Sequence, residues 1–149
     1  MSMLVRFRRP GGVQQLVSLL ESCLSKKRET LLKTICQEDE VFGEMIKSKL
    51  LTVEKIFTWD PLVISEVTTL VGERNLAISL IGLPKEFFDI ATHTLNVIKK
   101  RDMKNLIETL KPTSVEIETA QIKLVEKARQ VQKQGNLKID DDDDAFEVA

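Results

Sequence analysis

The most apolar stretch of the chain runs from Leu76 to Ile81, where only the small Ser79 is polar. A short run of this kind fits either a buried strand or a buried helix. The flanking residues favour a helix, because Gly82 is typical of the left-handed position past a helix end and Pro84 of the first turn of the next helix. The pattern therefore predicts a two-turn helix buried on every side, a tight corner, and a new helix from Pro84 to about Leu95.

Apolar residues three and four apart predict amphipathic helices before and after this stretch. The first begins at Val13 and includes Leu24 on its apolar face, the second follows the basic run 26–28, and the third follows the acidic run 38–40. A brief helix is expected in the junction 47–58, and longer ones at 61–71, 97–110 and 114–134. Asp60, Asn96, and either Thr113 or Ser114 are expected as N-caps, and Gly135 as the last stop. No strand-like alternation of useful length occurs, so the fold class is all-α.

Breaks and charge runs divide the chain into five parts. Residues 1–12 form a basic arm that ends in a flexible Pro10-Gly11-Gly12 linker, and residues 13–47 form a first helical unit. Residues 48–59 are a hinge segment, 60–137 a C-terminal helical domain, and 138–149 an acidic tail expected to be disordered.

Composition narrows the classes of function. The 149 residues carry a net charge of −1, which gives no general reason to expect nucleic acid or an anionic membrane as a partner. Only two cysteines are present, which suits a reducing compartment. No apolar run approaches the roughly 18 residues of a membrane span, and the basic residues near the start precede no apolar signal region. A cytoplasmic location without membrane insertion is expected.

Residue types that carry chemistry are sparse. His93 is the single histidine and lacks neighbouring ligands at metal-binding spacing, while Cys23 and Cys36 fit small buried residues. Gly11 and Gly12 are not followed by the residues of a phosphate loop, and the aspartates 140–144 lack the spacing of a calcium loop. We therefore predict no catalytic, cofactor-binding or metal-binding residues, and no enzyme.

Four basic residues lie close together in the predicted helix 97–110, namely Lys99, Lys100, Arg101 and Lys104. A solvated helix face and a docking surface for an acidic partner both fit this run. Surface ion pairs contribute about 0–1 kcal/mol each. A docking surface of this kind would therefore govern encounter and register more than affinity.

Several segments resemble, in the same order, the segments of one known helical domain. Gly11-Gly12-Val13 resembles its opening Gly-Gly linker, and Glu38 to Ile56 is similar to the acidic helix that leads into its Met-Phe-x-Phe hinge. GERNLAISLIG, from Gly72 to Gly82, resembles its RDLxLALKG segment. Thr119-Ala120-Gln121, followed by a long helix and an acidic tail, resembles its ending. That domain is the C-terminal domain of the bacterial flagellar motor switch protein family FliG.

The resemblance implies an armadillo-like helical unit at 13–47 and a six-helix unit at 54–135, joined by a hinge. It also implies a place in the cytoplasmic switch ring of the flagellar basal body, where the domain meets the cytoplasmic loop of the stator protein MotA and supports torque generation. The implied partners are a MotA-like loop and FliM-like and FliG-like neighbours, with no cofactor. Candidate stator-facing residues are Lys99, Lys100, Arg101 and Lys104, and the candidate hinge comprises Gly11, Gly12, Leu50, Leu51, Thr52 and Val53.

The chain departs from the family pattern at its functional positions. Leu50-Leu51-Thr52-Val53 replaces the aromatic hinge motif, and uncharged residues stand at the family's torque charges: Ile81, Ile98, Asn105, Leu106 and Ser114. The basic run is a candidate substitute for those charges. The resemblance covers neither of the family's two preceding domains, so we expect that either another polypeptide supplies them or the chain is a divergent paralogue.

The sequence thus predicts a non-enzymatic, FliG-like motor component that contacts the stator through its charged helix. The alternative is a divergent paralogue that serves as a helical adapter outside the torque step. A similar superfold occurs in the cytoplasmic domain of MgtE-type magnesium transporters, together with a membrane part that we do not find in this sequence.

Overall fold

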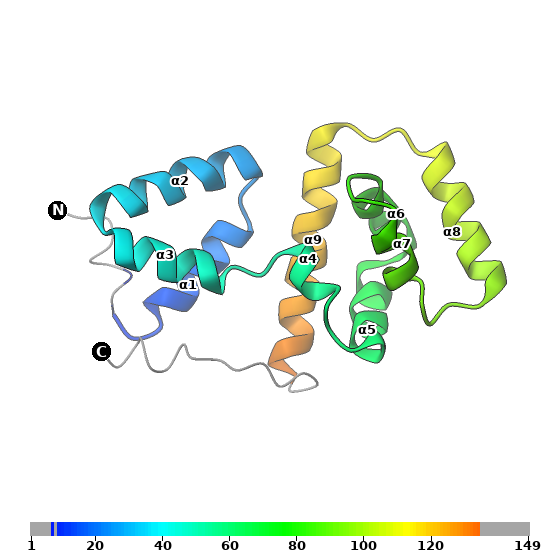
Figure 1. The fold of residues 1–149 in the computed structure, drawn as a ribbon, viewed down its shortest axis with the longest axis horizontal. Helices are drawn as coiled ribbons and strands as arrows, with labels where there is room; N and C mark the ends of the chain where they lie inside the picture. The colour runs from blue at the N-terminus through cyan, green and yellow to red at the C-terminus, as the bar shows by residue number, and fades with distance from the viewer. Residues whose placement is uncertain (1–6, 8, 135–149) are drawn as a thin grey trace. The chain divides into compact units, whose positions relative to one another are not determined.

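The computed structural model describes Phe7 and residues 9–134, and the expected basic arm before Phe7, the stop at Gly135 and the acidic tail lie outside this range. The described residues form helices and connecting turns without strands, which confirms the predicted all-α class (Figure 1). They divide into two compact units, and the division falls between Leu51 and Thr52.

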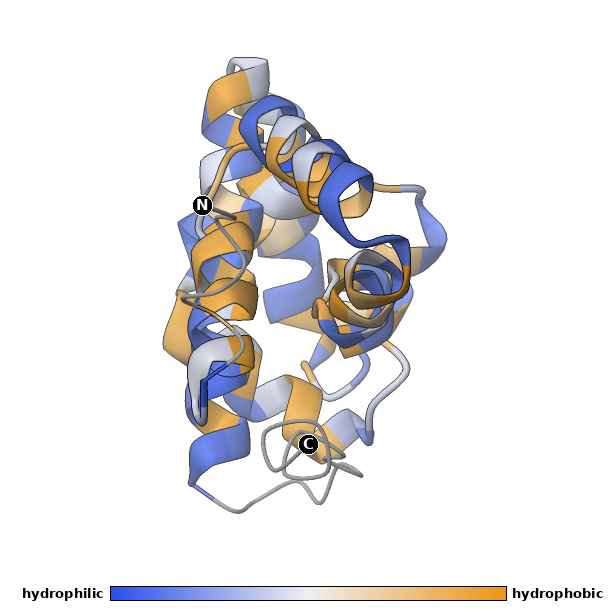
Figure 2. Cartoon of the chain, turned by 90° about the vertical axis from the view of Figure 1, so that its left-hand side faces the viewer, coloured by the Kyte–Doolittle hydropathy of each residue, from blue (hydrophilic) through white to orange (hydrophobic). Residues whose placement is uncertain are grey.

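The first unit is built from α1 (Gly12–Glu21), α2 (Ser25–Glu38) and α3 (Glu40–Lys49). Each helix packs against the other two. Apolar and polar residues alternate along these helices, as expected for amphipathic elements that share one core (Figure 2). The side chains of that core are Phe7, Val13, Leu16, Val17, Leu20, Ile35, Ile46 and Leu50.

The connection between α1 and α2 differs from the prediction. The helix α1 ends at Glu21, so Leu24 is not on its apolar face but is the N-cap of α2, 38% exposed. The basic run 26–28 lies inside α2 rather than before it. Side chains explain the early end, because the Ser22 hydroxyl donates to the carbonyl of Leu19 at 2.7 Å and the Arg28 guanidinium Nε donates to that of Leu20 at 2.9 Å. These side-chain bonds add to the backbone bonds that the amides of Ser22 and Cys23 donate to the same two carbonyls, both at 3.2 Å.

The Gly-Gly pair lies at the start of α1 rather than wholly in a linker before it. Gly11 adopts a left-handed conformation, with φ of 80°, as the N-cap of α1. Gly12 is the first helical residue and is buried, and a Cβ atom there would overlap the backbone carbonyl of Phe7. Close packing therefore explains the second glycine.

The second unit contains six helices within the described residues. They are α4 (Val53–Ile56), α5 (Pro61–Val71), α6 (Glu73–Ile81), α7 (Glu86–Ala91), α8 (Val97–Thr109) and α9 (Ser114–Lys133). The helix α6 packs against α5, α8 and α9, while α9 also contacts α4 and α5. The predicted burial of α6 is confirmed, because Leu76 to Leu80 are all buried.

Predicted N-caps hold three of these helices. The side-chain oxygens of Asp60 and Asn96 accept from the amides of Leu62 at 2.9 Å and Lys99 at 2.8 Å. Of the two candidates for α9, Thr113 is the cap, and its hydroxyl accepts from the amide of Glu116 at 3.2 Å. These bonds span two or three residues, so the local sequence determines them.

The corner after α6 does not contain the left-handed glycine that the sequence predicted. Gly82 has a φ of −83° and is not left-handed. A Cβ atom on it would lie 2.6 Å from Cγ2 of Ile117 in α9, so the close approach of α9 requires the glycine. Beside this contact the Gln121 amide donates to the carbonyl of Ser79 at 3.2 Å.

The helix predicted from Pro84 to Leu95 is much shorter. Pro84 lies two residues before α7, in a turn where its carbonyl accepts from the amide of Phe87 at 3.1 Å. The helix ends at Ala91, because the chain reverses after the fully buried Thr92, whose carbonyl accepts from the Leu95 amide at 2.9 Å.

Candidate functional site

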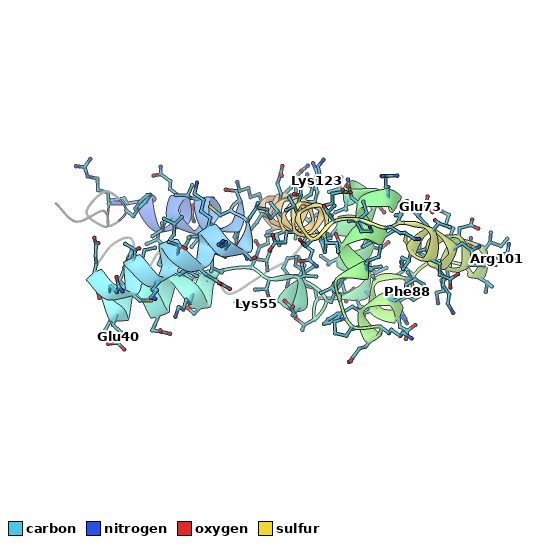
Figure 3. All side chains as sticks on the ribbon, turned by 90° about the horizontal axis from the view of Figure 1, so that it is seen from above. Glu40, Lys55, Glu73, Phe88, Arg101 and Lys123 are labelled. Carbon is cyan, nitrogen blue, oxygen red and sulfur yellow. The ribbon has the colours of Figure 1, made fainter. Side chains whose placement is uncertain are left out.

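The helix α8 holds the candidate stator-facing residues and contributes little to the core. Met103 is its single buried residue. The Asn96 cap and the contact with α6 hold the helix in place. Most of its side chains therefore face solvent, and Arg101 projects from α8 away from α5, α6 and α7 (Figure 3).

Helical phase separates the four basic residues into two sets. Successive residues of an α-helix are rotated by about 100°. Lys100, Arg101 and Lys104 fall within an arc of about 100°, and we call them the basic face. Lys99 lies about 160° around the helix from Arg101 by the same rotation. The structure thus brings together three of the four predicted residues.

The basic face has no internal ion-pair partner in the part of the chain that the structure describes. Arg101 and Lys104 are exposed and Lys100 is half-buried. No carboxylate within the described range pairs with any of the three. Glu108 lies one helical turn after Lys104, so the basic face is followed by an acidic residue.

Lys99 and Lys100 stand where positive charge is unfavourable for a helix. The N-terminal end of a helix carries a partial positive charge, which disfavours nearby cations. The first turn of α8 has no acidic residue and contains Lys99 and Lys100. Helix formation alone does not explain this placement.

The helix α2 provides an internal comparison. Its first turn also lacks acidic residues and carries basic ones. There Arg28 has a structural use, since one of its terminal nitrogens donates to the carbonyl of Cys23 at 3.0 Å. The basic face of α8 makes no hydrogen bond of this kind within the described residues.

Two exposed apolar side chains adjoin the basic face, and our reading of the sequence missed them. Val97 is 82% exposed and Ile98 61% exposed, both in the first turn of α8. Val97 lies one turn before Arg101, and its helical phase falls within the basic face. The sequence could have indicated their exposure, because the 3.6-residue period places both residues on a different side of the helix from Met103.

The candidate hinge residues lie at two places. Gly11 and Gly12 begin α1, as described above. Leu50 is the C-cap of α3, Thr52 is the N-cap of α4, and Val53 is the first residue of α4. Whether these positions move stays a prediction.

The described residues offer no other centre for chemistry. His93 is exposed, Cys23 is a buried thiol, and Cys36 is a half-buried one. Between Phe7 and Gln134, leaving out the undescribed residue 8, no group of three or more histidine, cysteine or acidic residues could hold a metal ion. No helix in this range is long and apolar enough to cross a membrane.

Comparisons with known proteins agree on one family. A family model described as the FliG C-terminal domain matches residues 33–139. A curated protein of Aquifex aeolicus (strain VF5), named flagellar motor switch protein FliG, is 31% identical over 134 residues, and the match covers 87% of this chain. The chain spans only 40% of that relative's length.

Two solved structures are similar. The crystal structure of FliG (residues 86-343) from H. pylori superposes with a TM-score of 0.69 at 20% identity, over 87% of this chain and 61% of that one. The structure of full-length FliG from Aquifex aeolicus gives a TM-score of 0.56 at 28% identity, over 83% of this chain and 39% of that one. The first of these likenesses concerns the fold alone.

Proposed function

The chain belongs to the FliG C-terminal domain family, and we propose that it is a component of the flagellar motor switch that contacts a stator protein through α8. Its place would be the cytoplasmic face of the flagellar basal body, beside FliM-like and FliG-like neighbours. No catalytic step is proposed, because the relative's name describes a motor switch protein.

The observation that carries this proposal is the basic face of α8. Lys100, Arg101 and Lys104 lie together on a helix whose single buried residue is Met103, and no described carboxylate pairs with them. A positive face that the fold does not use fits a partner with negative charge.

The exposed apolar pair supplies the affinity that surface charges lack. Desolvated apolar contacts dominate most protein interfaces, while charges at the rim set encounter rate and register. Val97 and Ile98 would provide the apolar part, and the basic face the charged part. The stator loop expected here therefore carries acidic side chains next to an apolar one.

The first test is a titration of the full chain with a MotA-like cytoplasmic loop. The variant Lys100→Glu, Lys104→Glu replaces attraction by repulsion at two positions. We expect binding to weaken about tenfold, which corresponds to about 1.4 kcal/mol, and the difference to shrink as salt is raised. Unchanged binding would contradict the proposal.

Two single charge reversals serve as matched controls. Lys99→Glu changes the same charge on α8 outside the basic face, and Lys123→Glu changes an exposed lysine of α9. Both should bind the loop like the unaltered chain. Equal weakening by all of these variants would indicate a general charge effect and no docking face.

The adapter alternative rests on the uncharged residues at the family's torque positions, such as Ile98. A strain deleted for this gene separates the two functions when filaments are counted on the same cells. Filaments without rotation would support torque generation, and loss of filaments an assembly role. Normal swimming would favour an adapter outside the torque step.

A further inference from the structure

The carboxylate of Glu21 accepts a hydrogen bond from Leu51, the residue at which the chain leaves the first unit. Glu21 is the last residue of α1 and is only 8% exposed. Its Oε2 accepts a hydrogen bond of 2.7 Å from the backbone N–H of Leu51, 30 residues further along the chain. Hydrogen bonds to an ionised carboxylate are stronger than neutral ones, so Leu51 is firmly tied to α1.

The next residue is held by the second unit. The hydroxyl of Thr52 accepts from the amide of Lys55 at 3.3 Å, and its carbonyl accepts from the amide of Ile56 at 3.1 Å. Thr52 is thereby fixed to α4 as its N-cap. The two anchors belong to adjacent residues but to different units.

Little backbone remains between these anchors. Upstream, the amide of Leu50 donates to the carbonyl of Lys47 at 3.3 Å, so the end of α3 is also held. Within the described residues, no further hydrogen bond holds the backbone between the amide nitrogen of Leu51 and the capping groups of Thr52. Of the candidate hinge residues 50–53, only the junction of Leu51 and Thr52 lies between the two anchors.

We propose that Glu21 is a latch that confines rotation between the two units to the Leu51–Thr52 junction. When the carboxylate holds Leu51, the pivot is short and the accessible orientations are few. Without it, the pivot extends back to the C-cap of α3 and gains backbone torsions, hence conformational entropy. The proposal does not depend on the stator contact.

The experiment measures both the latch and its consequence in the full chain. Hydrogen exchange reports on the amide of Leu51, and pulsed electron paramagnetic resonance reports the distribution of distances between the units. Spin labels are attached at Lys33→Cys and Lys123→Cys, which are exposed positions in different units, with Cys23 and Cys36 replaced by alanine.

The variant Glu21→Ala should release the latch. Loss of a hydrogen bond to a charged group predicts roughly tenfold or greater acceleration of Leu51 amide exchange. The distance distribution should broaden at the same time. Glu21→Gln should fall between the two, because an amide oxygen still accepts but carries no charge.

Asp39→Ala is the matched control within the first unit. Asp39 is also a carboxylate that caps a backbone amide, that of Phe42 at 3.1 Å, but it lies at the start of α3, away from the pivot. It should lower the stability of the unit and leave the distribution unchanged. Equal broadening by Asp39→Ala would overturn the latch and assign Glu21 a purely structural role.

A second variant tests the other anchor if Glu21→Ala fails to fold. Thr52→Ala removes the capping hydroxyl of α4 and should extend the pivot toward Val53, which also broadens the distribution. A folded Thr52→Ala and a folded Glu21→Gln that both keep the original distribution would overturn the proposal. None of these readouts involves a partner, so they are independent of the stator titration.

Discussion

The neighbouring helices α6 and α8 differ in how many of their side chains are buried in the core. The helix α6 buries five consecutive residues, Leu76 to Leu80, whereas α8 buries only Met103. Packing with three other helices constrains the side chains of α6. The outer face of α8 has no such constraint from packing, and the proposed stator contact uses this face. Substitutions in the two helices should therefore separate stability from binding.

The largest loss of stability is expected from Leu76→Ala. Leu76 is 3% exposed, and truncation of a buried leucine leaves a cavity and typically costs about 2–5 kcal/mol of unfolding free energy. Urea denaturation followed by circular dichroism measures this loss. A cost below about 0.5 kcal/mol, the range of surface substitutions, would contradict the buried placement of α6.

A smaller loss is expected from Gly82→Ala at the end of α6. The added methyl group would meet Cγ2 of Ile117, and overpacking of this kind costs roughly 1–3 kcal/mol. Ile117→Ala provides the control, because it removes the side chain that the new methyl group would meet. Gly82→Ala should therefore cost less stability in an Ile117→Ala background. If the double variant shows no such coupling, the contact with α9 is not the reason for the glycine.

The smallest effect on stability is expected on the outer face of α8. Lys100→Glu and Lys104→Glu should change the unfolding free energy by no more than about 0.5 kcal/mol, because neither residue has an ion-pair partner among the described residues. At position 100 an acidic residue near the helix N-terminus is even favourable. Thermal denaturation measures the change, and a loss above about 1 kcal/mol would show that this face belongs to the fold.

The sequence alone predicted the features whose interacting groups lie within a few residues of one another. The Asn96 cap joins atoms three residues apart, and the apolar run 76–81 predicts burial whatever surrounds it. The helix bounds of α8 and α9 and the basic run of α8 follow from the same local signals. Their physical basis is the short reach of a capping side chain and the 3.6-residue period.

The tertiary structure decided the features that join distant segments. Gly82 was assigned the wrong backbone conformation because its constraint comes from Ile117 in α9. The bond between Glu21 and Leu51 spans 30 residues and leaves no periodic or capping signal in the chain. Such contacts exist only after the helices have packed, because packing alone brings these atoms within hydrogen-bonding or van der Waals distance.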